Sequence, residues 1–479
     1  MTRSPTRLLR GLALVHGDEI PLYRQIYEHM RAAIWGGQLR PGDRVPSARD
    51  LAAQFGTARG TVDAAYAILA GEGYLSSRGA AGTVVSTELD NRPVGGAASR
   101  QRSRSRAAPH RTHELLPLQL GLPALDAFPR KIWSRLVARH ARAFAPTDMA
   151  YPEPSGYVPL REAIAAYLAT SRGVRCTAGE ILITNGYQDA LNLAASVLLR
   201  PGDKVWLEDP GYPSAAEALN AAGAALVPIR VDAEGVRVSE GLARARRARL
   251  AVVTPSHQSP LGVALSLPRR LGLLSWASDA GAWIIEDDYD SEFRYVGRPL
   301  PALKSLDQDE RVLYAGSFSK VLYPGLRLGY LVVPDSLIDA FTHSIRLRYL
   351  GHPTLEQRVV ADFMAAGHFA RHIKRMRALY GARRRTLADN LSQVLGDRVT
   401  VEPRPGGMHL IARLGRGLHD VELAKPARAY GFAVEALSRR AMTHECGQGL
   451  LLGFTNVAES DARNVCERLR LAIGKRLNP

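Results

Sequence analysis

The chain is poor in cysteine. Only Cys176, Cys446 and Cys466 occur among its 479 residues, and none belongs to a CxxC pair or stands near a histidine that could complete a metal site. Zinc sites need several ligands at short, characteristic spacings, and disulfide-stabilised secreted domains need several cysteine pairs. We therefore expect neither a bound metal nor a disulfide framework, and a reducing cytoplasm is the simplest compartment.

Long hydrophobic runs are also missing. Arg3, Arg7 and Arg10 give the N-terminus a basic character, but the apolar stretch that follows, residues 11–15, is shorter than the core of a signal peptide. No run of about 18 apolar residues, the length that crosses a bilayer, occurs anywhere in the sequence. We expect a soluble cytoplasmic protein with no membrane partner.

Acidic residues are fewer than basic ones. The chain has 46 Asp and Glu against 63 Lys and Arg, so its formal net charge is +17. Its 46% of hydrophobic residues is ordinary for a globular protein, and at roughly 150 residues per domain the length predicts about three domains. The positive charge favours an anionic partner such as nucleic acid, although it carries no information about the fold.

A break in composition divides the chain. Residues 87–115 are rich in Gly, Pro, Ser and Arg and show no hydrophobic period that could build a core. We interpret them as a flexible linker between residues 18–86 and residues 116–479. The alternating arginines and serines of the linker could contact phosphates, but a charge run of this kind is more often simply solvated. These arginines are Arg100, Arg102, Arg104 and Arg106.

The N-terminal segment has the pattern of a winged helix. Apolar residues recur at helical spacing over 22–34, and Ser47 followed by Asp50 predicts the capped start of a short second helix that Gly56 ends. A third helix is predicted over about 58–70, and residues 74–79 and 83–85 read as a two-stranded hairpin. The helical part is typical of a helix-turn-helix, and the hairpin would be its wing. A small helical domain without a ligand is the alternative, since this spacing also occurs in bundles.

A family resemblance favours DNA binding. The stretch from PLYRQIYEHMRAAI to GTVV resembles the winged helix of the GntR regulator family along nearly its whole length, including LRPGDRVPSARDLA and the EGYL before the wing. The resemblance implies that the third helix enters the major groove of a double-stranded operator and that the wing touches the minor groove or the backbone. It implies DNA contacts for Arg44, Ser47, Arg49, Arg59, Thr61, Arg78 and Gly79.

The second segment alternates helical stretches with short apolar strands at 181–183, 204–207, 250–253, 283–285 and 312–314. Such alternation predicts an α/β fold with a largely parallel sheet. Each strand is followed by polar or glycine-rich residues, in order TNGYQ, EDPGYPS, TPSHQSPLG, EDDYD and AGSFSK. Because ligands of open α/β sheets bind beyond the carboxyl ends of the strands, we expect these loops to converge on one site.

The loops carry residue types that suit pyridoxal phosphate. A partly desolvated amine such as Lys320 can form an imine with a carbonyl, and Asp287 could stay ionised beside a pyridinium nitrogen. Arg327 and the amides of Gly186, Tyr187 and Gln188 suit a phosphate dianion. Tyr212 offers a face for stacking on the ring, and Tyr289 a hydroxyl for the ring oxygen. Each feature alone is more often structural, so the hypothesis rests on their placement at successive strand ends.

This segment resembles the aspartate aminotransferase fold, fold type I, and specifically the effector domain of the MocR subgroup of GntR regulators. The similar strings include YPEPSGYVPLREAIAAYLATSRGV, IIEDDYDSEFRY and SFSKVLYPGLRLGY. The resemblance implies Lys320 as the Schiff-base lysine, Asp287 at the pyridine nitrogen, Tyr289 near O3′ and Tyr212 stacked on the ring. It further implies a homodimer in which Tyr151 reaches the partner's site, and it places His257 near the ring oxygen. Its phosphate-binding residues would be Ser317, Ser319, Arg327, Tyr187 and Gln188.

The leading hypothesis is a DNA-binding transcription regulator whose signal is pyridoxal phosphate or an amino compound that reacts with it. The rival is a working aminotransferase that carries a DNA-binding appendage. Such enzymes usually bind the substrate carboxylate through an arginine in a stretch like LLLGFTN at 450–456, where this chain has leucines, and Arg439 is the nearest alternative. The carboxylate end of the pocket is therefore poor in positive charge, which favours the cofactor itself as the signal. A third reading, an empty dimerisation scaffold, fails to explain the full set of cofactor residues.

Overall fold

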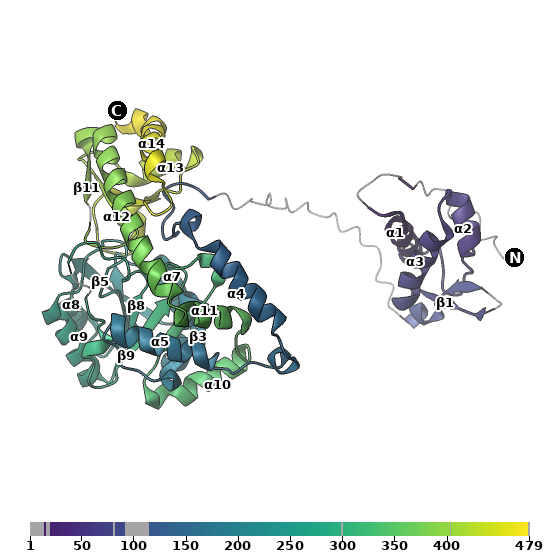
Figure 1. The fold of residues 1–479 in the computed structure, drawn as a ribbon, viewed down its shortest axis with the longest axis horizontal. Helices are drawn as coiled ribbons and strands as arrows, with labels where there is room; N and C mark the ends of the chain where they lie inside the picture. The colour runs from purple at the N-terminus through teal and green to yellow at the C-terminus, as the bar shows by residue number, and fades with distance from the viewer. Residues whose placement is uncertain are drawn as a thin grey trace. The chain divides into compact units, whose positions relative to one another are not determined.

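The computed structural model describes residues 14–15, 20–79, 82–91, 115–297, 300–402 and 404–477. The chain divides into two compact units, residues 1–112 and residues 113–479 (Figure 1). The arginines of the predicted linker, residues 100–106, lie outside the described residues, as do Arg3, Arg7 and Arg10. Within the described ranges, no helix is both long enough and apolar enough to cross a membrane.

The N-terminal unit is a winged helix-turn-helix. Its elements are α1 (Leu22–Trp35), α2 (Ala48–Phe55), α3 (Arg59–Gly71), β1 (Leu75–Ser77) and β2 (Thr83–Val85), with β1 and β2 paired antiparallel. Ile26, Met30, Leu51, Val62 and Leu69 form the centre of its own hydrophobic core. The helices and the hairpin therefore follow the predicted pattern.

The turn between α2 and α3 is set by local chemistry. The Asp50 amide donates to the Ser47 hydroxyl oxygen at 3.1 Å, and that hydroxyl donates to the Asp50 carboxylate at 2.7 Å. At the other end of α2, Gly56 has φ of 59°, the left-handed conformation that ends helices. These two signals keep α2 short and let α3 begin three residues later.

The larger unit is built on an eight-stranded sheet in the order β3-β10-β9-β8-β7-β4-β5-β6. Neighbouring strands from β9 to β5 are parallel, whereas β10 runs antiparallel to both β3 and β9, and β6 runs antiparallel to β5. The sheet is largely parallel, as predicted, and β3, β4, β7, β8 and β9 all end at the same edge. The strands are β3 (Ile181–Thr184), β4 (Lys204–Asp209), β5 (Ala225–Asp232), β6 (Gly235–Val236), β7 (Leu250–Val253), β8 (Trp283–Asp288), β9 (Val312–Ser317) and β10 (Gly329–Val332).

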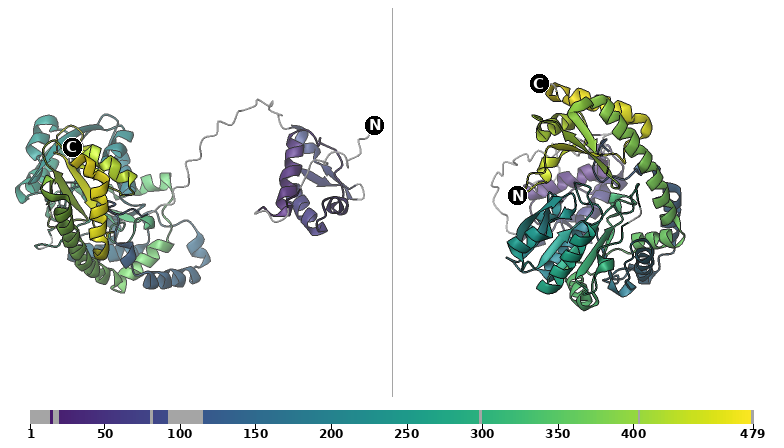
Figure 2. Two further views of the ribbon diagram at one scale, coloured as in Figure 1. Left: turned by 90° about the horizontal axis from the view of Figure 1, so that it is seen from above. Right: turned by 90° about the vertical axis from the view of Figure 1, so that its left-hand side faces the viewer.

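Hydrophobic clusters cover both faces of this sheet, which explains why its strands read as continuous apolar runs. On β3, Ile181 and Ile183 pack into one cluster and Leu182 into another. The surrounding helices are visible in Figure 2. They are α4 (Arg130–Arg142), α5 (Val158–Ser171), α6 (Tyr187–Leu198), α7 (Pro213–Ala221), α8 (Val238–Ala245), α9 (Leu267–Ala280), α10 (Ile338–Arg348) and α11 (Leu355–Ala365).

A C-terminal lobe completes the larger unit. The long helix α12 (His368–Leu395) leads into an antiparallel sheet of order β11-β12-β14-β13, which α13 (Asp420–Ala429) and α14 (Ala462–Leu477) accompany. Its strands are β11 (Val399–Glu402), β12 (His409–Leu414), β13 (Glu435–Ala436) and β14 (Gly449–Gly453).

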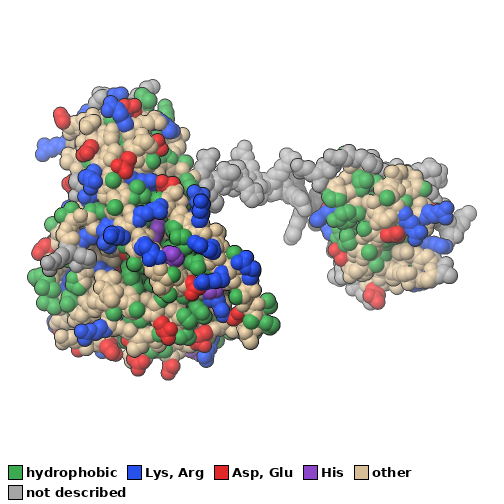
Figure 3. Space-filling model, viewed as in Figure 1, with side chains coloured by type: hydrophobic (Ala, Val, Ile, Leu, Met, Phe, Trp, Pro, Cys, Tyr) green, Lys and Arg blue, Asp and Glu red, His purple; other side chains and the backbone are tan. Residues whose placement is uncertain are grey.

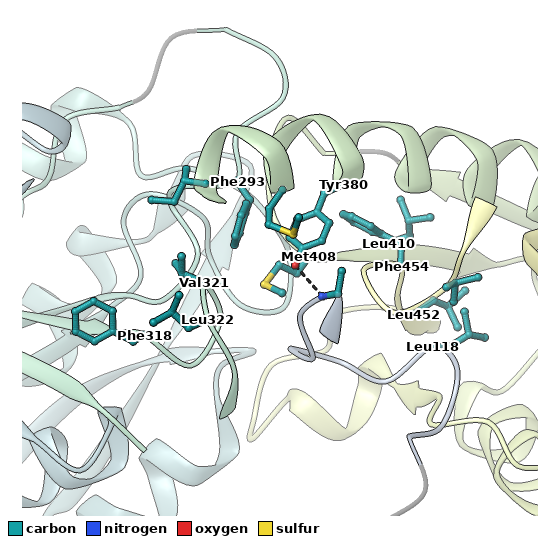
Figure 4. Close-up of a cluster of buried hydrophobic side chains, with 14 of the residues drawn as sticks. Leu118, Phe293, Phe318, Val321, Leu322, Tyr380, Met408, Leu410, Leu452 and Phe454 are labelled. Carbon is teal, nitrogen blue, oxygen red and sulfur yellow. Dashed lines mark hydrogen bonds between the residues drawn. The ribbon is translucent and has the colours of Figure 1, made fainter. Parts of the chain in front are cut away.

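Tyr380 of α12 joins this lobe to the rest of the unit. Its ring packs against Phe293 and Phe454, and the Ala124 amide donates to its hydroxyl at 2.9 Å (Figure 4). Leu118 lies in the same core cluster. Segment 118–124 is thereby held between the two sheets, and this brings Gly121 to the candidate site.

Candidate functional site

A cavity of about 350 Å³ lies at the carboxyl ends of the parallel strands. Each of the five loops singled out in the sequence contributes to it, the loop after β7 through Ser259 and Pro260. Segment 120–121 and the C-terminal lobe close it from other sides. Of the predicted cofactor residues, the cavity wall contains Tyr187, Gln188, Tyr212, Asp287, Tyr289, Ser317, Ser319, Lys320 and Arg327.

Lys320 presents its amine to this cavity. Its Nζ donates to the Gly121 carbonyl oxygen at 3.0 Å. Burial lowers the pKa of the amine from its usual value, although the negative charges of Asp290 and Asp287 act in the opposite direction. A buried amine that gives up its proton readily is suited to attack a carbonyl carbon.

Gly121 is a site residue that sequence reasoning missed. Its φ is +65°, and a Cβ at this position would lie 2.3 Å from Lys320 Nζ. Only glycine can therefore bring its carbonyl so close to the lysine. Nothing in the surrounding LGLP marks the position, because a glycine beside leucines carries no chemical signal.

Asp287 supplies a buried carboxyl group near the end of β8, a strand buried along its whole length. Burial raises the pKa of this carboxyl well above its ordinary value, while a hydrogen bond from the Tyr187 hydroxyl works in the opposite direction. Asp288 and Glu208 add further negative charge nearby. A cationic ring nitrogen beside Asp287 would offset the energetic cost of burying its negative charge, so this carboxyl group fits a pyridinium partner.

A cradle for an anion lies at the start of α6. Gly186 precedes this helix with φ of 82° and ψ of 179°, and Gly329 of β10 packs so closely that a Cβ there would lie 2.9 Å from the Gly186 Cα. The first amides of a helix carry partial positive charge and lack partners within the helix. Arg327 adds a full charge, and its guanidinium donates to the Asn185 carbonyl at 3.1 Å. Together with the hydroxyls of Ser317 and Ser319 these groups suit a phosphate dianion.

Tyr289 and His257 are also brought together. The Tyr289 hydroxyl lies 3.0 Å from His257 Nδ1, which is itself 3.2 Å from Asp290. His257 lines a neighbouring smaller cavity rather than the main one. Tyr212 lies at the edge of the main cavity, 39% exposed, with its ring centroid 6.2 Å from that of Tyr187.

Arg439 and Tyr151 do not line the cavity, and neither do His257 and Gly186. Arg439 is exposed, and the structure places the adjacent Arg440 in the cavity wall instead, with its guanidinium 2.5 Å from the Glu435 carboxylate. The two arginines lie in the short helix η11 (Leu437–Arg440), where consecutive side chains point in directions about 120° apart. Tyr151 is 85% exposed, so its contact with a partner's site stays a prediction.

The C-terminal lobe contributes residues that the sequence did not reveal. His409 of β12 lines the cavity, with its Nε2 2.8 Å from the Pro260 carbonyl oxygen. Burial and the nearby His257 lower the pKa of His409 to about 4. This ring is therefore neutral at neutral pH.

On the N-terminal unit, the predicted DNA-contacting residues are exposed, except for Thr61, which is half-buried. Arg59 lies 3.4 Å from Asp63 on α3, and Arg44 packs its guanidinium against Gly82 of the wing. The Ser47 hydroxyl already caps α2. DNA contacts of these residues stay predictions.

Comparison with known proteins supports both units. Residues 22–85 match the family of bacterial regulatory proteins called gntR, and residues 129–447 match the aminotransferases of class I and II. The chain is 38% identical to a probable rhizopine catabolism regulatory protein, MocR, from Rhizobium meliloti, over 96% of this chain and 95% of that protein. It is 34% identical to the pyridoxine biosynthesis transcriptional regulator PdxR from Corynebacterium glutamicum, over 96% of this chain and 98% of that one.

Solved aminotransferase structures share the fold of the larger unit. A Pyrococcus horikoshii kynurenine aminotransferase, in complex with PMP, aligns with a TM-score of 0.69 and 29% identity over 77% of this chain and 93% of the enzyme. The α-aminoadipate aminotransferase LysN from Thermus thermophilus, complexed with N-(5′-phosphopyridoxyl)-L-leucine, aligns with a TM-score of 0.69 and 29% identity over 76% of this chain and 92% of that one.

Proposed function

This chain belongs to the MocR subgroup of the GntR family of transcription regulators, and from this premise we propose that its larger unit binds pyridoxal phosphate and adjusts DNA binding in response. The protein is a transcription regulator of the helix-turn-helix type, as its relatives are named.

The observation that carries the proposal is the set of three ionisable groups around one cavity: the amine of Lys320, the carboxyl of Asp287 and the guanidinium of Arg327. They match, in order, the aldehyde, the ring nitrogen and the phosphate of pyridoxal phosphate. When bound, this group supplies an electrophilic carbon that a lysine can hold covalently and that an amino compound can take over.

The remaining wall residues would orient the ring. Tyr289 would donate to the ring oxygen, with His257 fixing its hydroxyl, and Tyr212 would stack on one face. Ser317, Ser319, Gln188 and the first amides of α6, beginning at Tyr187, would share the phosphate with Arg327. Gly186 lets the backbone approach the phosphate closely, because glycine has no side chain to intervene.

We propose pyridoxal phosphate itself as the signal, with an amino compound as the alternative. Arg440, which the C-terminal lobe contributes to the cavity wall, is already paired with Glu435, and Leu451 lines the wall beside them. A carboxylate effector would have to separate this ion pair, whereas the cofactor alone would not. The name of the relative that regulates pyridoxine biosynthesis points in the same direction.

The second candidate is a working aminotransferase, because solved structures similar to the larger unit include enzymes 29% identical to it. Such an enzyme would convert amino acids with a keto acid as acceptor. An assay of the holo protein with a panel of amino acids and 2-oxoglutarate separates the two: product formation over many turnovers identifies an enzyme.

We further propose a homodimer, in which Tyr151 of one protomer contacts the cofactor site of the other. Fold type I sites are completed between subunits, and two winged helices would read two half-sites. Tyr151 is almost fully exposed in a single chain, as this arrangement requires. Light scattering on the cofactor-bound protein at micromolar concentration measures the mass directly.

The decisive experiment follows the absorption spectrum of the chain on addition of pyridoxal phosphate, before and after borohydride. The native protein should gain a visible band that reduction abolishes, and Lys320→Ala should not gain it. Lys374→Ala, which removes an exposed lysine on α12, is the matched control. A reducible band that persists in Lys320→Ala would refute the assignment of the lysine.

A further inference from the structure

One face of the larger unit is strongly basic. Helix α4, with the sequence RKIWSRLVARHAR, contains no acidic residue, and α12 contains none before Asp389. The exposed cations of α4 and of the first eight residues of α12, 368–375, form what we call the basic face. They are Arg130, Lys131, Arg135, Arg139, Arg142, Arg371, Lys374 and Arg375.

The two helices present these cations side by side. The guanidinium of Arg375 donates to the Ala127 carbonyl, just before α4 begins. Further along, Arg135 and Arg139 of α4 line one groove together with His368, the first residue of α12. Figure 3 shows Lys and Arg side chains gathered over this side of the unit, where Figure 1 places α4 and α12.

Little of this charge is neutralised. Asp362 of α11 accepts from Arg139 and lies 2.6 Å from His140 Nε2. Within the described part of the chain, the side chains of Arg130, Lys131, Arg135, Arg142 and Lys374 have no hydrogen bond or ion pair. The pKa of His368 is lowered by its partial burial and by the positive charges of Arg371 and Arg135. Like charges that repel one another in this way are stabilised by an anionic partner.

The extent of the basic face indicates which kind of anion it binds. The cations spread over a helix of 13 residues, about 20 Å at 1.5 Å per residue, and this extent exceeds that of a small metabolite. Duplex DNA carries one negative charge per about 1.7 Å of its axis, so it can meet all of them at once. A second copy of the chain docking through the same face would place arginines against arginines.

We propose that the basic face is a second DNA-binding surface, which holds the phosphate backbone of the duplex that flanks the operator. The proposal rests on DNA binding by the winged helix. The covalent chain from Asn91 to Leu115 can span at most about 80 Å, so the basic face stays at high local concentration around DNA that the winged helix holds. Contacts of this kind add affinity and salt dependence but no sequence specificity.

The test compares two charge-matched triple variants of the full chain loaded with pyridoxal phosphate. One combines Lys131→Ala, Arg135→Ala and Lys374→Ala on the basic face. The other combines Arg200→Ala, Arg246→Ala and Arg247→Ala, exposed residues just before β4 and β7. The probes are duplexes selected by the native protein from a random-sequence pool, either trimmed to the protected core or extended by about 20 base pairs on each side.

Dissociation constants are measured by fluorescence anisotropy over a series of KCl concentrations. On the extended duplex, the basic-face triple should reduce the magnitude of the slope of log K against log [KCl] by about 2 to 3, where K is the association constant. Each lost phosphate contact removes about 0.9 from this magnitude. The control triple should match the native slope, and all three proteins should behave alike on the trimmed duplex. Far-UV circular dichroism and retention of the cofactor band establish that each variant is folded.

Equal slopes for the two triples on the extended duplex would overturn the proposal. An equal reduction of the salt slope on the trimmed and the extended duplexes would also overturn it, because the basic face would then contact the operator itself. If the native protein selects no duplex at all, the proposed function fails and not only this inference.

Discussion

Asp209 and His444 lie in contact although they are 235 positions apart: His444 Nδ1 is 2.9 Å from Asp209 Oδ2. Asp209 ends β4, and its carboxylate also accepts from the amides of Met442, Thr443 and His444. The Gly211 amide donates to the Arg440 carbonyl at 3.1 Å. The loop that leads to Tyr212 is therefore fastened to the segment of the C-terminal lobe that follows Arg440.

The first prediction concerns this attachment. Burial alone would raise the pKa of Asp209, but hydrogen bonds from the amides of Met442, Thr443 and His444 hold it below its usual value. Asp209 should therefore stabilise the fold above about pH 4, its unfolded pKa, and this contribution should disappear as the pH falls through its lower folded value. Asp209→Asn should cost about 1–3 kcal/mol at pH 7.

Thermal unfolding of the native chain and of Asp209→Asn at pH 7 and at pH 3 checks this. The difference in stability between the two proteins should be large at pH 7 and smaller at pH 3. Asp203→Asn, at the opposite end of the same strand region, serves as the control. A difference that does not change with pH would contradict the assigned role of the charge.

The second prediction concerns the proton on Lys320. Burial lowers the pKa of its amine from 10.5. When pyridoxal phosphate is added to the cofactor-free chain, the rate at which the visible band appears should rise with pH and reach its plateau before pH 10.5. Asp290→Asn removes a negative charge that raises this pKa and should move the midpoint to lower pH. Stopped-flow absorbance over a pH series gives both midpoints. A rate that still climbs beyond pH 10.5 would show that Lys320 behaves as an exposed lysine.

The third prediction concerns Gly121. In Gly121→Ala a methyl group would lie 2.3 Å from Lys320 Nζ, so we expect at least a tenfold weaker affinity for pyridoxal phosphate, or about 1.4 kcal/mol. Gly202→Ala is the control, because Gly202 also has a positive φ, +89°, but has open space around its Cβ position. Equal cofactor affinities of the two variants would mean that backbone strain, and not contact with the lysine, determines the effect.

The fourth prediction concerns the winged helix. Arg49→Ala and Arg59→Ala should each weaken operator binding, by about 1–3 kcal/mol where the arginine reads a base edge. Where it contacts only phosphate, the salt slope should fall by about 1 instead. Arg24→Ala, on α1, is the control, since Arg24 lies beside Glu28 and was not predicted to contact DNA. Unchanged affinity and slope in both test variants would remove α2 and α3 from the interface.

The strands and the residues that follow them were predictable because two local signals coincide. A strand buried on both faces is a short apolar run, and polar residues at its end or just past it, such as Asp287 and Lys320, must lie at the sheet edge. The direction of β10 was not predictable, since Gly329–Val332 is an apolar run like the others. Only its pairing with β3 and β9 shows that it is antiparallel.

Residues that reach the cavity from outside the main sheet could not be found in this way. His409 and Arg440 come from the C-terminal lobe, whose position depends on tertiary packing around Tyr380. The choice between Arg439 and Arg440 depends on the orientation of one short turn, which composition does not encode.

The length of α12 has a mechanical consequence. Its 28 residues span about 42 Å, with one end in the basic face and the other beside β11. Because helices bend only gently, a tilt of about 5° would displace one end relative to the other by about 3–4 Å. α12 would thus transmit a small tilt of the C-terminal lobe to the surface cations at its far end.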